Sequence, residues 1–161
     1  MLHNFGEWIE HIPWVAHIGS TAWLYSSISV IHYFTLFVLV GTSILVDLRV
    51  LGLAARKQPV TKFASQIFPW MWTAFWLAIV SGFLMFATAA GDFLPDHIFQ
   101  IKMAVILAAV IFVILVQRNI PRWGDLPSIP AGAKVVAWLS LILWIGAILA
   151  GVDIAAISGL G

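Results

Sequence analysis

Four long runs of apolar residues, separated by short polar stretches, dominate the pattern along this chain. They cover about residues 22–45, 63–89, 99–116 and 135–157. A helix needs about 20 mostly apolar residues to cross the hydrocarbon core of a bilayer, so each run provides roughly one crossing. The pattern therefore predicts an all-α integral membrane protein, a four-helix bundle that forms a single membrane domain over residues 1–161.

The first 20 residues follow a different pattern. Phe5, Trp8, Ile9 and Ile12 recur at helical spacing, and Pro13 then interrupts the run. A short amphipathic helix of this kind lies in the membrane surface rather than across it. We therefore expect an N-terminal interfacial helix whose tryptophan joins an aromatic belt at the outer surface.

Composition supports a membrane protein and excludes several classes of function. Of the 161 residues, 62% are hydrophobic and 9% are charged, whereas a soluble domain carries roughly 25% charged residues. The net charge of +1 and the absence of a basic stripe exclude a nucleic-acid partner. The chain has no cysteine, which excludes thiolate metal sites, iron–sulfur clusters and c-type haem attachment. The partner that the sequence does predict is the lipid bilayer.

The positive charges predict the orientation. All but one of the lysines and arginines lie in or beside the first and third interhelical loops: Arg49, Arg56, Lys57, Lys62, Arg118, Arg122 and Lys134. By the positive-inside rule these loops face the cytoplasm, which places the N- and C-termini outside. At the cytoplasmic end of the first span, we expect Asp47 and Arg49 to interact with headgroups or with the next loop.

Prolines and small residues predict local irregularities. Pro69 should kink the second span or mark its first turn, and residues 119–127, rich in Pro and Gly, should form an irregular loop. Glycines within the spans, such as Gly82, let membrane helices approach closely or leave room for a flat macrocycle.

Three ionisable residues lie within apolar runs. His32 is deep in the first span, Lys102 is about one turn inside the third, and Asp153 is near the outer end of the fourth. Ionisable groups at membrane depth are costly and usually functional. Ser29 lies one turn before His32 and is expected to orient it. Because all three ionisable residues fall in the outer half, they predict one polar site there.

The sequence leaves several roles open for these residues. His32 is either a packing residue, an axial ligand of haem b or a proton relay. Lys102 either extends to the outer headgroups, pairs with a haem propionate or Asp153, or ligates iron as a neutral amine. His97 and His17 lie near the outer surface and are further candidate metal ligands. Copper binding there, with help from the other N-terminal histidines, is the weakest of these patterns.

Two short motifs resemble a known group of proteins. His32 is followed nine residues later by Gly41 and then by DLRVLGL at 47–53, and FQIKM occupies 99–103. Over about residues 23–119 the chain resembles an uncharacterised group of small four-helix bacterial membrane proteins. It is more distantly similar to the CopD copper-resistance proteins and to four-helix, haem-dependent protoporphyrinogen oxidases. In those oxidases a first-span histidine and a lysine in a later helix are the key residues, and His32 and Lys102 match them.

The resemblance implies haem b and a bacterial inner membrane. The leading hypothesis is a membrane cytochrome b with His32 as one axial ligand and Lys102, His97 or His17 as the second, with Ser29 and Asp153 beside the cofactor. It would exchange electrons with a quinone or a redox partner protein, alone or within a homo- or hetero-oligomer. The alternatives are a non-catalytic membrane subunit with a structural His/Lys/Asp network, and a protein that handles copper or another metal.

Overall fold

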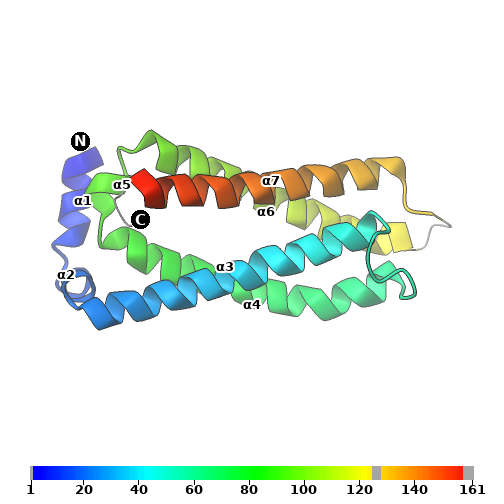
Figure 1. Cartoon of the computed structure of the whole chain (residues 1–161), viewed down its shortest axis with the longest axis horizontal. Helices are drawn as coiled ribbons and strands as arrows, with labels where there is room; N and C mark the ends of the chain where they lie inside the picture. The colour runs from blue at the N-terminus through cyan, green and yellow to red at the C-terminus, as the bar shows by residue number, and fades with distance from the viewer. Residues whose placement is uncertain (1, 125–127, 158–161) are drawn as a thin grey trace. The chain divides into compact units, whose positions relative to one another are not determined.

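The computed structural model describes residues 2–124 and 128–157, with side chains as far as Leu149. Within these residues the chain is all-helical (Figure 1). Four helices are long: α3 (Ala22–Val50), α4 (Val60–Ala87), α6 (His97–Gly124) and α7 (Ala131–Ile157). Three are short: α1 (Leu2–Glu10), α2 (Pro13–Ser20) and α5 (Ala90–Phe93).

The four long helices are each long and apolar enough to cross a membrane, which confirms the predicted fold class. Their large apolar side chains point away from the protein in many places; Phe37, Trp70 and Leu107 are 78%, 68% and 62% exposed. Soluble proteins rarely expose so much contiguous apolar surface, whereas lipid tails are as apolar as these side chains. The exposed surface therefore fits a multi-pass protein in a bilayer.

The end of α3 is built by a glycine. Gly52 has a φ of +76°, a left-handed conformation that glycine adopts without steric cost. The Leu53 N–H donates to the Leu48 carbonyl at 2.9 Å, and the Gly52 N–H donates to the Arg49 carbonyl at 3.1 Å. These two bonds form a Schellman motif, so the helix stops at Val50.

The start of α6 is capped by an aspartate. The two carboxylate oxygens of Asp96 accept hydrogen bonds from the backbone N–H groups of Ile98 and Phe99, each at 3.1 Å. Such an N-cap satisfies amides that have no partner within the helix. It fixes the position of His97 as the first residue of α6.

The expected irregular loop at 119–127 was wrong for residues 119–124, because α6 continues through Pro121 to Gly124. Ile120 is 3% exposed and belongs to a hydrophobic cluster, against which Trp123 packs. Burial of these side chains offsets the cost of a proline within a helix. Pro69 likewise lies inside α4 rather than in its first turn.

The helices pack into two compact units. The first contains Met1–Leu39 and Trp72–Gln100, and therefore α1, α2, α5 and part of α3 and α4. The second contains Val40–Met71 and Ile101–Gly161, and therefore the remainder of α3 and α4 with most of α6 and α7.

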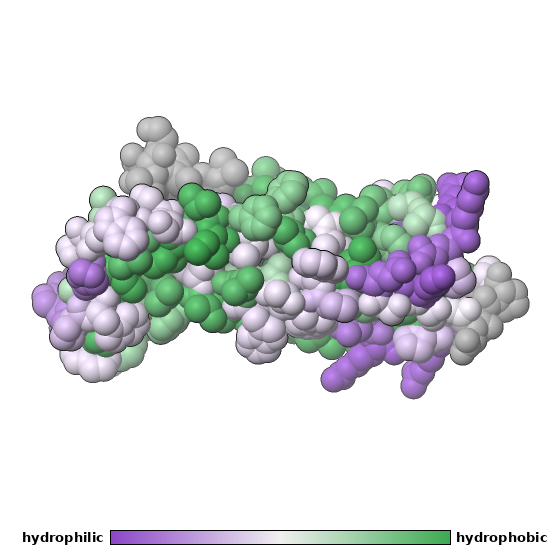
Figure 2. Space-filling view, turned by 90° about the horizontal axis from the view of Figure 1, so that it is seen from below, coloured by the Kyte–Doolittle hydropathy of each residue, from purple (hydrophilic) through white to green (hydrophobic). Residues whose placement is uncertain are grey.

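The second unit has a core to which all four long helices contribute. The core consists of small and branched apolar residues: Val46, Val50, Val60, Ala64, Val116, Ile120, Ala133 and Ala137. Strongly hydrophilic side chains gather at one end of this unit (Figure 2), where the interhelical loops carry the lysines and arginines. The charge and the apolar surface are thus separated along the helices, as in a membrane-spanning domain.

At the end of α3 we expected Asp47 and Arg49 to contact headgroups or the next loop. This expectation was correct for Arg49 but wrong for Asp47. The Arg49 guanidinium donates to the Gln58 carbonyl in the following loop, at 3.2 and 2.6 Å. Asp47 is only 2% exposed and therefore does not reach headgroups or the loop. The helix turns it toward the interior, because the residue lies on the same face of α3 as Ser43, one turn earlier.

In the first unit, α1 packs directly on α5 (Figure 1). Gly6 is buried, and its Cα lies so close to Ala90 and Gly91 that an added Cβ would lie 2.5 Å from the Ala90 carbonyl carbon. Glu10 completes the contact, because its Oε1 accepts a hydrogen bond from the Gly91 N–H at 2.7 Å. The predicted interfacial helix is thus held to the protein by a backbone contact and a side-chain cap.

We expect Glu10→Ala to weaken the docking of α1. The change leaves the Gly91 amide without its carboxylate partner, and a hydrogen bond to a charged group contributes about 1.5–3 kcal/mol where it is desolvated. Because Glu10 is partly exposed, we expect a loss near 1 kcal/mol and a severalfold faster hydrogen exchange of the α5 amides. Mass-spectrometric hydrogen exchange in nanodiscs measures this rate.

Glu7→Ala is the matched control for that experiment. Glu7 is exposed, and its carboxylate lies 3.6 Å from Nδ1 of the exposed His3 on the same helix, a type of contact that contributes little. Equal exchange rates in the two variants would show that the Glu10–Gly91 bond does not hold α1 in place.

Candidate functional site

His32 faces α4 from the middle of α3, in the first unit. Its Nδ1 lies 3.1 Å from the hydroxyl oxygen of Ser81. Ser81 is 5% exposed, and its hydroxyl also lies 2.6 Å from the carbonyl of Leu77, one turn earlier in α4. The half-buried imidazole is therefore joined to the neighbouring helix by a side-chain hydrogen bond.

The hydrogen-bond network assigns the tautomer of His32. A hydroxyl has one proton to donate, and the Ser81 hydroxyl donates it to the Leu77 carbonyl at 2.6 Å. The Ser81 oxygen is then left to accept, which favours the neutral tautomer of His32 with its proton on Nδ1. The lone pair of the imidazole is consequently on Nε2, the atom through which a metal would be bound.

Gly82 allows this close approach. A Cβ at position 82 would lie 2.8 Å from Cε1 and 3.3 Å from Nδ1 of His32. Contacts under 3.0 Å do not occur between such atoms in stable packing, so any larger residue would displace the ring. The glycine within the second span thus makes room for an imidazole.

The backbone and neighbours of His32 are also ordered. The Thr35 hydroxyl, in a residue that is 5% exposed, donates to the His32 carbonyl at 2.9 Å. The ring of Tyr33 meets the imidazole at an angle of 60°, with centroids 6.0 Å apart. These contacts hold the α3 segment in a defined position around the histidine.

Ser81, which contacts Nδ1 of His32, was missed by sequence reasoning. The Ser29 hydroxyl instead donates to the Tyr25 carbonyl in its own helix at 2.9 Å. A serine–glycine pair, Ser81 and Gly82, in an otherwise apolar span was the available signal. This pair did not point to His32, because Ser81 lies 49 positions after His32 in the chain.

The remaining candidate residues are spread over both units. Lys102 is half-buried near the start of α6 and belongs to the second unit, whereas His32 belongs to the first. His17, in α2, and His97, at the start of α6, are both exposed. The side chain of Asp153 lies outside the described residues.

The histidines and acidic residues form no multidentate metal site in the part of the chain that the structure describes. There, no three His, Cys, Asp or Glu side chains approach one another closely enough to hold a metal ion. A single oriented imidazole is a different kind of ligand, because a haem supplies four of the iron ligands itself and needs the protein for the axial positions.

Comparison with known proteins places the chain in a family. No curated protein and no solved structure matches it. A family model matches residues 5–156, which cover every described helix except the first three residues of α1 and the last residue of α7. The chain therefore belongs to DUF6644, a family of unknown function.

Proposed function

We propose that this protein binds haem b in the membrane and takes part in electron transfer, with His32 as an axial ligand. The observation that carries the proposal is the 3.1 Å hydrogen bond between Nδ1 of His32 and the Ser81 hydroxyl. Metal-ligating histidines almost always donate their other ring N–H to a protein acceptor, which fixes the tautomer and the ring orientation. A half-buried histidine held in this way within an apolar helix is suited to bind iron through Nε2.

The residues of the chain would have separate tasks in such a site. His32 provides the ligand atom, Ser81 orients the ring, and Gly82 admits the ring close to α4. The haem supplies the one-electron chemistry when it is bound. The second ligand is a choice among Lys102, His97 and His17. If Lys102 is not that ligand, it would pair with a haem propionate or with Asp153.

The resemblance to haem-dependent four-helix oxidases favours the same assignment, since His32 and Lys102 match their key residues. The orientation predicted from the cations places the cofactor in the outer half of a bacterial inner membrane. Electrons would then pass between a quinone and a partner protein on the outer side, either from this chain alone or within a larger complex.

A structural role is the second candidate, and the same hydrogen bond favours it. The His32–Ser81 contact joins α3 to α4, and hydrogen bonds between membrane helices contribute roughly 0.6–2 kcal/mol. The protein would then be a non-catalytic subunit whose polar residues fix helix packing. The two candidates differ in whether the purified protein contains a chromophore.

An absorption spectrum of detergent-purified protein, expressed with haem in supply, separates these candidates. We expect a Soret band in the wild type and its loss in His32→Ala. In Ser81→Ala we expect haem affinity to fall by about 10–100-fold, the usual effect of removing such an orienting partner. His11→Ala is the control, because His11 is exposed and bonds within α1 and its flanking turn.

Two results would contradict the haem proposal. One is a wild-type protein without a Soret band, accompanied by a loss of stability in His32→Ala, as the structural role predicts. The other is a Soret band of equal intensity in the wild type and His32→Ala.

A further inference from the structure

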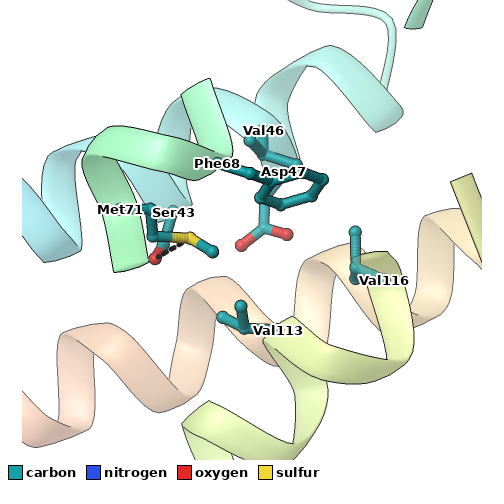
Figure 3. Close-up of a pocket in the computed structure, with 7 residues that line it drawn as sticks. All are labelled: Ser43, Val46, Asp47, Phe68, Met71, Val113 and Val116. Atoms are coloured by element: carbon teal, nitrogen blue, oxygen red, sulfur yellow. Dashed lines mark hydrogen bonds between the residues drawn. The ribbon is translucent and has the colours of Figure 1, made fainter. Parts of the chain in front are cut away.

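A small pocket lies inside the second unit, in the half of the helices that carries the cations. It is lined by residues of α3, α4 and α6: Ser43, Val46, Asp47, Phe68, Met71, Val113 and Val116 (Figure 3). Its volume is ≈ 10 Å³, about the space that a single water molecule needs. The carboxylate of Asp47 points into the space between these side chains (Figure 3).

Three buried polar atoms in the second unit have no hydrogen-bond partner among the described residues. They are Oδ2 of Asp47, Oγ of Ser140 and Nε1 of Trp144. The three residues are 2%, 0% and 2% exposed, respectively. Burying such atoms without a partner costs several kcal/mol for a charged group and less for a neutral one, so native proteins usually satisfy them with an ordered water or ion.

The donors and acceptors of these residues suit one water molecule. Ser140 faces Asp47 from α7, and Trp144 lies one turn further along the same face of α7. The indole can only donate, the carboxylate oxygen accepts, and the serine hydroxyl can do either. A water can accept from the donors of α7 and donate to Asp47, which supplies the two to four partners that buried waters have.

The site is too poor in oxygen for a metal ion. Apart from Asp47, the pocket lining contributes a single hydroxyl, and the Ser43 hydroxyl is within hydrogen-bond distance of the Met71 sulfur, at 3.5 Å. Hard cations require about six oxygen ligands, whereas most of this wall is hydrocarbon. A proton, in contrast, binds to a single oxygen atom, which the Asp47 carboxylate provides.

We propose that this pocket is a proton-binding site, in which one water beside Asp47 and Ser140 exchanges protons between Asp47 and the cytoplasm. On uptake, a hydronium ion breaks one O–H bond, Oδ2 of Asp47 forms a new O–H bond, and a water molecule remains in the pocket. Release reverses these steps. No electron transfer is involved, and the proposal does not depend on haem.

Distance and charge around the site favour such exchange. Asp47 lies three residues before the last residue of α3, about 4.5 Å along the helix axis, so the route to the cytoplasmic surface is short. Asp47 is the one ionisable residue of the pocket lining, to which α4 contributes Phe68 and Met71 and α6 contributes two valines. The α7 residue beside Asp47 is Ser140, which is not ionisable. Arg49, the nearest cation along α3, is bound to the Gln58 carbonyl.

Infrared difference spectroscopy as a function of pH tests the proposal. In the wild type we expect a carboxylic C=O stretching band that appears and disappears reversibly with pH, and its complete loss in Asp47→Asn. Asp92→Asn, which changes an exposed aspartate in α5, is the matched control and should keep the band. Ser140→Ala keeps the carboxyl group and should shift the band, because it removes one partner of the bridging water.

Three other outcomes of these measurements would overturn the proposal. The same difference spectrum in the wild type and Asp47→Asn would show that Asp47 does not exchange a proton. A band that responds to sodium against potassium at constant pH would identify a metal-cation site instead. An unshifted band in folded Ser140→Ala would exclude the bridging water even if Asp47→Asn fails to fold.

Discussion

Gly6→Ala should release α1 from the rest of the protein and cost about 3 kcal/mol. The new methyl group would lie 2.5 Å from the Ala90 carbonyl carbon and closer still to the Gly91 nitrogen. Both are backbone atoms of α5, so the overlap cannot be relieved by a side-chain rotation. Overpacking in well-packed sites typically costs about 1–3 kcal/mol. Because backbone atoms cannot move aside as a side chain can, we expect a cost at the upper end of this range.

Limited proteolysis measures the release. A protease that cleaves after glutamate can act at Glu7 and Glu10 only when α1 opens, and 3 kcal/mol corresponds to roughly a hundredfold change in the open population. Gly19→Ala, in α2, is the matched control. Its Cβ would lie 3.6 Å from Thr88, an ordinary contact, so the better helix propensity of alanine should leave the rate unchanged or lower it.

Unchanged cleavage in Gly6→Ala would contradict the close α1–α5 contact. Faster cleavage in both glycine variants would attribute the effect to the N-terminal helices in general rather than to the contact with α5. The prediction therefore requires that cleavage become faster in Gly6→Ala but not in Gly19→Ala.

Gly82→Ala should displace the His32 ring and break its bond to Ser81. The added Cβ would lie 2.8 Å from Cε1 of the imidazole, so either the ring rotates away or α3 and α4 separate. Both outcomes lose the 3.1 Å hydrogen bond. We expect a net destabilisation of about 1–3 kcal/mol, although alanine is the better helix former by about 1 kcal/mol.

The thermal midpoint in detergent reports this loss, at roughly 2–4 °C per kcal/mol for a chain of this size. Gly41→Ala is the control, since an added Cβ there has no neighbour within 4 Å, and it should be neutral or stabilising. If the haem proposal holds, Gly82→Ala also lowers haem occupancy. A midpoint for Gly82→Ala as high as that for Gly41→Ala would mean that the ring does not rely on the space at position 82.

Secondary structure was largely predictable because membrane helices are set by local composition. An apolar run in a bilayer must satisfy its backbone hydrogen bonds within itself, so the four runs read from the sequence became α3, α4, α6 and α7. The helix ends were less predictable. Pro121 and Gly124 signal a loop, yet packing of Ile120 and Trp123 against the second-unit core carries α6 through them.

The side-chain contacts of the site were not predictable in the same way. His32 stood out because an ionisable residue in an apolar run is costly. Its partner Ser81 depends on the register between α3 and α4, which no local pattern encodes. Asp47 shows the same limitation: its position near the end of a span predicts contact with headgroups, whereas the helix packing turns it inward, to 2% exposure.

The sequence by itself therefore determined the class of protein and the number of candidate membrane helices, and it identified His32 as an ionisable residue deep in an apolar run. These properties follow from composition and residue spacing, because they depend on residues that are close to one another in the chain. Only the tertiary structure decided which hydroxyl orients His32, that Gly82 makes room for the ring, and that Asp47, Ser140 and Trp144 carry unsatisfied polar atoms in one unit. Those properties depend on the close approach of helices that are far apart in the chain, where differences of one ångström decide between a hydrogen bond and a clash.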